Sequence, residues 1–278
     1  MLCDLHTHSV FSDGTWTPEE LVEEAERIGL AAIALTDHNT VAGLPRFLRA
    51  AQGKAVEAVP GVEFSTDYRG IDLHIVALDV CPAQFERVTA LMEEGVRAKQ
   101  ASNLDLAQGL CRAGYPVDYA AICSAVPGGQ PNRAHFAAAL VEQGCFPDRQ
   151  AAFRTVLDPS FGLYHPPKRP DVFEIIRFIR SIGAVSVMAH PFLKLDETGV
   201  REFLRQALPA GLDAMETRYV SFDEKTTALA IRIAGESGLR QSGGSDFHGA
   251  NKPGISIGTG LGGLRVPAEF LPLLRRPR

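Results

Sequence analysis

The chain has 278 residues, of which 45% are hydrophobic and 22% charged, and its formal net charge is -5. This composition is typical of a globular domain with a sizeable core, while the acidic balance argues against an extended nucleic-acid-binding surface, which needs a basic face. No apolar run approaches the roughly 18 residues of a membrane span, and a histidine already stands at residue 6, so we expect neither a membrane segment nor a signal peptide. Five cysteines without C-x-x-C spacing indicate reduced thiols in a cytoplasmic protein.

The first candidate metal-binding residues follow a short apolar run at residues 1–5. His6 and His8 are two residues apart, so a strand through them directs both imidazoles to the same side. Asp13 follows in a turn, and a helix is predicted over 18–28, because Thr17 can cap it and a proline stands at its first position. Two imidazoles beside a carboxylate can chelate a transition metal, although an isolated His-x-His pair is more often a surface feature.

Strands and helices alternate in the next part of the chain. The continuous apolar run at 30–36 predicts a strand that is buried on both faces of a parallel sheet. A helix and two strands are predicted after it, over residues 41–51, 55–65 and 71–79.

Residues 82–164 differ from the rest of the chain in their predicted secondary structure. Glycine and proline punctuate a series of helical patterns there, and no convincing strand is present. These patterns cover residues 84–112, 118–125, 132–143 and 148–157. We interpret the segment as a helical insertion that projects from the main body and covers the active site, with residues 1–81 and 165–278 forming the main domain.

The alternation then resumes and continues to the C-terminus. Helices are predicted over residues 171–182, 197–208, 223–237 and 268–274, and strands over 184–189, 212–216, 239–243 and, more weakly patterned, 255–258. Repeated strand–helix units with polar residues at strand ends indicate an α/β fold, a (β/α) barrel with its site at the C-terminal face of the strands. A doubly wound open sheet is the competing architecture. The barrel is favoured because it brings residues from nearly every strand end to one point.

The histidines concentrate at these strand ends. Of the eight, five follow predicted strands (His6, His8, His38, His190 and His248), one lies inside a strand (His74), and carboxylates accompany them (Asp13, Asp37, Glu63 and Asp246). Six imidazoles with three or four carboxylates exceed what one tetrahedral metal can use, which predicts two or three divalent metals. This donor mixture suits manganese, iron or zinc, whereas calcium and magnesium prefer oxygen ligands. The alternative is that several of these side chains orient the ligands of fewer metals.

In their order these motifs resemble those of the PHP family, named after polymerase and histidinol phosphatase. Its four motifs are matched by His6-x-His8 with Asp13, by Thr36-Asp37-His38, by His190-Pro191 and by Ser245-Asp246-Phe247-His248, and the intervening ligand positions by Glu63 and His74. The match covers essentially the whole chain. It implies a distorted (β/α)7 barrel, similar to a TIM barrel, that acts as a metal-dependent phosphoesterase.

The resemblance also implies a ligand set for three metals. The first would be held by His6, His8, Glu63 and Asp246, the second by Glu63 as a bridge with His74 and His190, and the third by Asp13, His38 and His248. Catalytic roles fall to Glu63, Asp246, His190 and His248. Asp37 would orient a ligand imidazole.

The insertion resembles that of PHP phosphoesterases acting on small nucleotides. Such relatives remove the 3′-phosphate of 3′,5′-nucleoside bisphosphates, and some degrade short oligoribonucleotides from the 5′ end. Where they usually have Gly-Arg-Pro-His, this chain has Asn132-Arg133-Ala134-His135. We therefore expect a phosphate monoester of a small nucleotide, or a short 5′-phosphorylated RNA, as the substrate of a metal-activated water.

Basic side chains are candidates for the substrate contact. Arg133 can form a fork with a phosphate, Lys168 and Arg169 can add a second cationic contact, and His135 can bind phosphate or cap a helix. Each cation has a solvated surface role as its alternative, and His165 is expected at the surface.

Three other functions fit parts of the pattern. A histidinol-phosphate phosphatase is disfavoured by the nucleotide-type insertion, and a non-catalytic module stabilised by metals is disfavoured by the complete ligand set. An amidohydrolase would need a lysine after a strand to form a carbamylated bridge, and Glu63 takes that position here.

Overall fold

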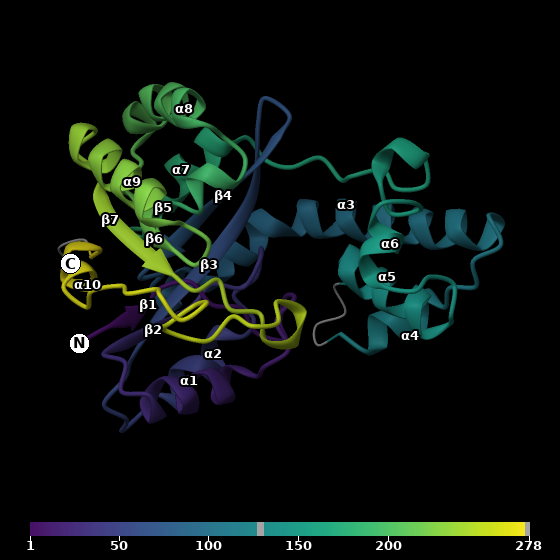
Figure 1. Ribbon diagram of the computed structural model, residues 1–278, viewed down its shortest axis with the longest axis horizontal. Coiled ribbons are helices and arrows are strands. Elements are labelled where there is room, and N and C mark those ends of the chain that lie inside the picture. Colours follow the sequence, from purple (N-terminus) through teal and green to yellow (C-terminus); the bar gives the residue numbers. More distant parts are fainter. Residues whose placement is uncertain (127–130, 276–278) are drawn as a thin grey trace.

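The protein is a barrel with a helical projection (Figure 1). The computed structural model describes residues 1–126 and 131–275; residues 127–130 of the predicted insertion and 276–278 lie outside the description. Within the described residues, seven strands form one sheet that is nearly closed, in the order of the sequence. They are β1 Cys3–Asp4, β2 Ala32–Leu35, β3 Glu57–Tyr68, β4 Ile71–Leu78, β5 Val185–Met188, β6 Ala214–Tyr219 and β7 Arg240–Gly244. The predicted barrel is confirmed, because a doubly wound sheet would interrupt this sequential order.

The barrel closes between its first and last strands. The amide of Leu5 donates to the carbonyl of Gly243 (3.1 Å), and Thr7 and Phe247 form an isolated parallel bridge. The approach is so close that a Cβ on Gly244 would lie 2.4 Å from the Cβ of His6, so only glycine fits there. The regular part of β1 is shorter than the predicted strand. The closure nevertheless brings the candidate metal ligands near the N-terminus close to those near the C-terminus.

Strands β3 and β4 form an antiparallel hairpin with no helix between them. Their two-residue turn, Arg69 and Gly70, has φ of 55° and 82°, as a type I′ turn requires. β4 therefore runs against its neighbours, and the pairing of Ser65 with His74 places His74 on the same face of the hairpin as Glu63. The sequence pattern predicted both strands but did not indicate their relative direction.

Helices cover the outside of the barrel. They are α1 Pro18–Arg27, α2 Leu44–Ala50, α7 Val172–Ser181, α8 Glu197–Ala210 and α9 Glu224–Glu236. Side chains cap the N-termini of all but α2 among these five. Thr17 forms a capping box with Glu20 at α1, while an aspartate caps each of α7, α8 and α9. The side chains of β2 alternate: Ile33 and Leu35 join the cluster under the helices, and Ala32 and Ala34 join a second, interior cluster.

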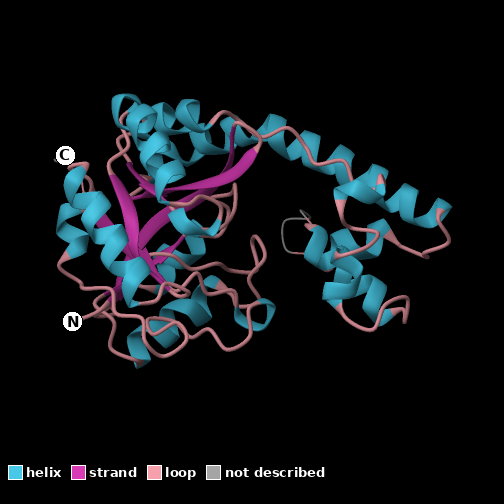
Figure 2. Cartoon of the chain, turned by 45° about the horizontal axis from the view of Figure 1, so that its top comes forward, coloured by secondary structure: helices cyan, strands magenta, loops and turns pink. Residues whose placement is uncertain are grey.

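The helical projection has a core of its own. It comprises α3 Phe85–Arg112, α4 Tyr119–Ser124, α5 Arg133–Glu142 and α6 Arg149–Phe153. The 28 residues of α3 span about 42 Å and lead away from the barrel to the other three helices (Figures 1 and 2). A cluster that includes Leu106, Phe136 and Leu140 contains no barrel residue. This separate core supports our proposed division into a barrel (1–81 and 165–278) and an inserted helical domain (82–164).

The C-terminal part differs from the prediction in one element. Residues 255–258 form no strand within the described chain; Ser256 pairs with Gly260 in an isolated bridge, and the amide of Gly258 donates to Asp4. The short helix α10 Phe270–Leu273 follows. Among the described residues, no helix is both long and apolar enough to cross a lipid bilayer.

Replacement of Phe136 by alanine tests the proposed division. Phe136 is fully buried in the cluster of the helical domain, so we expect the variant to lower the free energy of unfolding of that domain by about 3–5 kcal/mol. Hydrogen exchange would then show lost protection in the helical domain and retained protection in β2 to β7. The exposed Phe161 serves as the control, because its replacement by alanine should change stability by less than about 0.5 kcal/mol. Equal loss of protection in the barrel would contradict two separate units.

Candidate metal centre

The nine predicted metal ligands lie together at one end of the barrel. His6 and His8 follow β1, His38 follows β2, and Glu63 and His74 come from the β3–β4 hairpin. Three more follow later strands: His190 after β5, and Asp246 and His248 after β7. Asp13 lies in the loop between β1 and α1. Three groups among these side chains have ligand atoms close enough to hold a metal ion: His6, His8 and Glu63; His38, Glu63 and His74; and His8, Asp13, His38 and His248. Asp246 lies beside the first group and His190 beside the second.

The first group combines the imidazoles of His6 and His8 with the carboxylate of Glu63, and Asp246 lies beside it. The Nε2 atoms of His6 and His8 are 3.0 Å apart, and each lies 3.1–3.2 Å from Oε2 of Glu63. Oδ1 of Asp246 is 3.3 Å from Nε2 of His8 and 3.7 Å from Nε2 of His6. Four ligands placed tetrahedrally about 2.1 Å from a zinc ion are separated by about 3.4 Å. The spacing of the three atoms from His6, His8 and Glu63 therefore suits one metal ion, and Asp246 lies next to both imidazoles.

Glu63 connects this group to a second one. Its other oxygen, Oε1, is 2.8 Å from Nδ1 of His74 and 3.0 Å from Nε2 of His190. One carboxylate thus presents each of its oxygens to a different set of imidazoles. This is the geometry of a bridging ligand, the role expected from the family resemblance.

The third group is centred on Asp13. Its Oδ1 lies 3.2 Å from Nε2 of His248 and 3.8 Å from Nε2 of His38. Nδ1 of His8 is 3.9 Å from the same oxygen, so His8 faces two groups. His38 also reaches Oε2 of Glu63 through Nδ1, at 3.2 Å. The three expected ligands are present, and the groups are more closely connected than the resemblance implied.

Unpartnered buried atoms show that this arrangement suits cations. Nδ1 of His8 and of His38, Oδ1 of Asp13 and Oε2 of Glu63 are buried without a hydrogen-bond partner among the described atoms. Leaving such a group unsatisfied costs about 1–3 kcal/mol, and more if it is charged. All four atoms belong to the groups above and are ordinary metal ligands. Metal ions would therefore satisfy them.

The electrostatics of the cluster also favour metal binding. Burial alone would raise the pKa of Glu63, but the imidazoles of His6, His38 and His74 outweigh it and hold that pKa well below its usual range. Burial would likewise lower the pKa of His74, but Glu63 and Asp72 raise it to about 10. Glu63 is therefore ionised near neutral pH and ready to bind a cation, while the raised pKa of His74 means that metal binding there competes with a proton.

Glu216, in the middle of β6, supports His6 and His190 and was not identified from the sequence. Its Oε1 is 2.8 Å from Nδ1 of His6, and its Oε2 accepts from the backbone amide of His190 (2.6 Å). The first contact orients the Nε2 atom of His6 toward Glu63. The second holds His190 in a left-handed conformation, with φ of 30°, that is strained for a non-glycine residue. A single glutamate carries no motif, so only its place in space reveals this role.

Asp37 has a different partner from the one expected. Its carboxylate accepts from the amide and hydroxyl of Ser9 (2.8 and 2.6 Å) and from the hydroxyl of Ser12 (2.6 Å). It therefore fixes the loop between His8 and Asp13, and no imidazole among the described residues donates to it. Hydrogen bonds from Ser9 and Ser12, rather than one from an imidazole, compensate for the burial of this carboxylate.

The predicted phosphate-binding residues have different surroundings in the structure. Arg133 lies over the rings of Phe153 and Tyr164 and donates to the carbonyl of Leu157, contacts that assign it to the packing of the helical domain. Lys168 is exposed. Arg169 pairs with Asp72 at 2.9 Å. That Arg133, Lys168 or Arg169 also contacts the substrate stays a prediction.

Two polar contacts connect the helical domain to the cluster. Nδ2 of Asn132 donates to Oδ2 of Asp13 (3.3 Å), and Arg149 donates to Oδ1 of Asn251 (2.9 Å). Asn132 also caps α5, and its backbone N–H donates to Nδ1 of His135 in a capping box. His135 thus has the capping role that the sequence left open, beside the third ligand group. His165 is exposed, as expected.

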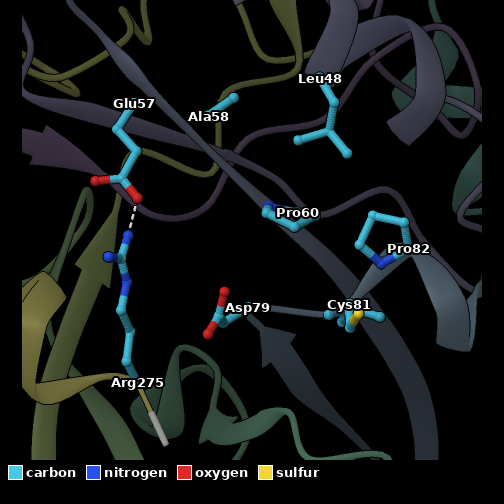
Figure 3. Close-up of a pocket in the computed structure, with 9 residues that line it drawn as sticks. Leu48, Glu57, Ala58, Pro60, Asp79, Cys81, Pro82 and Arg275 are labelled. Atoms are coloured by element: carbon cyan, nitrogen blue, oxygen red, sulfur yellow. Dashed lines mark ion pairs between the residues drawn. The ribbon is translucent and has the colours of Figure 1, made fainter. Parts of the chain in front are cut away.

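A cavity of about 580 Å³ lies elsewhere, between the start of β3 and the end of β4. Figure 3 shows Glu57 paired with Arg275 across it, among mostly apolar neighbours such as Leu48 and Pro60. Glu57 is six residues before Glu63 on the same strand, a distance of about 20 Å. The cavity therefore lies apart from the metal ligands.

Known proteins resemble the chain over nearly its whole length. A family model described as a PHP domain matches residues 4–149. A 5′-3′ exoribonuclease from Haemophilus influenzae is 32% identical over 88% of this chain and 89% of its own. A 3′,5′-nucleoside bisphosphate phosphatase from Chromobacterium violaceum is 28% identical over 99% and 94%. A solved structure from Bifidobacterium adolescentis, assigned to a metal-dependent phosphoesterase, matches with a TM-score of 0.86 at 27% identity, over 98% and 94%.

Replacement of Glu63 by glutamine tests its bridging position. Because each of its oxygens faces a different ligand group, we expect the variant to retain fewer metal ions per chain than the wild type, with the loss not confined to one site. Elemental analysis after gel filtration measures the content. His165→Ala, at an exposed position outside the cluster, should retain the wild-type content. Full metal content in Glu63→Gln would refute the bridge.

Replacement of Glu216 by glutamine tests the support of His6 and His190. Glutamine has one acceptor oxygen, whereas two N–H groups, of the His6 ring and the His190 backbone, contact Glu216. Metal affinity should therefore fall about 10- to 100-fold. Competition with a chelator of known affinity measures this change. The control is Glu236→Gln on the outer helix α9, where the carboxylate is far from the ligands and pairs with the partly exposed Arg201. Equal affinities of the two variants would show that Glu216 does not act on the metal ligands.

Proposed function

The chain belongs to the PHP family and is a phosphoric ester hydrolase, and we propose that it removes a phosphate monoester from a small nucleotide. The most specific form of this proposal is hydrolysis of a 3′,5′-nucleoside bisphosphate to the nucleoside 5′-monophosphate, with short 5′-phosphorylated RNA as a further substrate. The observation that carries it is the set of three connected ligand groups around Glu63. The names of the exoribonuclease and the bisphosphate phosphatase support the nucleotide class.

The ligand groups suit the chemistry of phosphate esters. Divalent metals held there would lower the pKa of coordinated water and neutralise the charge of the phosphoryl group. The protein supplies the positions: Glu63 fixes the separation of two groups, Glu216 orients His6, and Asp37 fixes the loop that carries Asp13. Manganese, iron and zinc all accept this mixture of imidazole and carboxylate.

Basic groups of the helical domain support a substrate with a second phosphate. Burial lowers the pKa of His135, and its charge environment includes Asp13, Lys99 and Arg149. Lys99, on α3, was not identified from the sequence, and Asp13 and Arg169 influence its pKa, which burial lowers. The interaction of Lys99 with Asp13 brings this lysine near the third ligand group. A nucleotide carrying two phosphates would place one at the metals and the other near Lys99.

Phosphate release from a small panel of substrates tests the proposal. The manganese-loaded protein would be given adenosine 3′,5′-bisphosphate, 5′-AMP, histidinol phosphate and a short 5′-phosphorylated RNA, each with and without a chelator. We expect chelator-sensitive phosphate release from the bisphosphate with 5′-AMP as the product, and mononucleotide release from the RNA. Release from histidinol phosphate alone would place the activity in histidine synthesis, and inactivity of fully metal-loaded protein on all four would contradict a nucleotide phosphatase.

A further inference from the structure

The two carboxylate oxygens of Asp246 contact different partners. Oδ1 faces the first ligand group, 3.3 Å from Nε2 of His8. Oδ2 turns away from that group and accepts two hydrogen bonds, from the hydroxyl of Tyr219 (2.7 Å) and from Nζ of Lys252 (2.5 Å). The backbone of Asp246 has φ of 53°, a conformation that is strained for aspartate and fixes this division.

The two donors to Oδ2 differ in their access to solvent. Tyr219 lies in β6 and is buried, whereas the side chain of Lys252 is 39% exposed. Among the described residues, Lys252 is the one lysine or arginine that forms an ion pair with a predicted metal ligand. A positive charge therefore stands between the ligand cluster and solvent.

The turn that carries Lys252 is anchored to the loop of another ligand. Nδ2 of Asn251 donates to the backbone carbonyl of Asp13 (2.8 Å), and the amide of Ala250 donates to Oγ1 of Thr15 (2.9 Å). Gly249 permits this approach, with φ of 62° and no room for a Cβ beside Thr15. The backbone of the turn is thus fixed, while the flexible lysine side chain extends from it.

We propose that Lys252 is a substrate-binding residue whose ammonium contacts the phosphoryl group at the ligand cluster. This inference rests on the phosphatase function proposed above. An ammonium has three N–H donors and no fixed plane, so it can turn from a carboxylate to a phosphate oxygen. A phosphate dianion carries more charge than a carboxylate whose other oxygen faces a cation. Tyr219 retains its hydrogen bond to Oδ2 and keeps Asp246 in position when Lys252 turns.

The alternative role for Lys252 is to hold Asp246 in place for the metal, as Tyr219 does. The two roles differ in what a substitution changes. A residue that only positions Asp246 would affect metal retention, whereas a substrate-binding residue would affect the affinity for phosphate in protein that keeps its metals.

Lys252→Gln and Tyr219→Phe separate these roles. We expect Lys252→Gln to keep the wild-type metal content and to show a KM for the phosphate ester and an inhibition constant for inorganic phosphate that are each raised roughly 10- to 100-fold. Lys252→Arg should restore part of the phosphate affinity. Tyr219→Phe should lower the affinity for manganese, measured by chelator competition. Lys54→Gln, in an exposed turn, is the control for the change of one charge.

Direct binding of inorganic phosphate keeps this test independent of the proposed reaction. Titration calorimetry with manganese-loaded protein gives the dissociation constant for phosphate even if no ester in the panel is hydrolysed, and thermal unfolding verifies that each variant folds. Weaker phosphate binding by Lys252→Gln at full metal content would support the proposal. Unchanged phosphate binding, or metal loss equal to that of Tyr219→Phe, would overturn it.

Discussion

The structure depends on the accommodation of ionised carboxylates in a buried cluster of imidazoles. Glu63 is almost fully buried, yet five imidazoles lie within 3.2 Å of its two oxygens, and both its burial and its charge would be costly without positive partners. Several of the surrounding polar atoms lack hydrogen bonds within the described chain. Divalent cations resolve this conflict, so the same feature that costs stability in the metal-free protein gives the site its affinity for metal.

Two features of the barrel make this cluster possible. Closure between β1 and β7 joins residues more than 230 positions apart in sequence, since the amide of Asp246 donates to the carbonyl of His6. The antiparallel β3–β4 hairpin places His74 beside Glu63 even though His74 is not at a strand end. A regular barrel with a helix after each strand would direct the middle of β4 into the interior. The departure from regular topology therefore contributes a ligand.

A layer of hydrogen bonds behind the cluster determines how it is presented to a substrate. Glu216 and Tyr219, both from β6, fix His6 and Asp246 from the inner side, while Asn132 and Lys252 approach from the side of the helical domain and solvent. The inner contacts are buried and suit a permanent structural role. The outer contacts are more accessible and suit exchange with a ligand, which is the physical basis for assigning substrate recognition to that side.

The sequence by itself determined the class of the fold and the set of candidate metal ligands. Periodicity and caps are local signals, so the strands and helices of the barrel could be predicted, and ordered motifs such as His6-x-His8 and Asp246-Phe247-His248 indicated the family. Only the tertiary structure decided the reversed direction of β4, the packing role of Arg133, and the positions of Glu216, Tyr219 and Lys252. These features arise from contacts between residues distant in sequence. A lone glutamate, tyrosine or lysine has the same local pattern whether it faces solvent or a metal ligand.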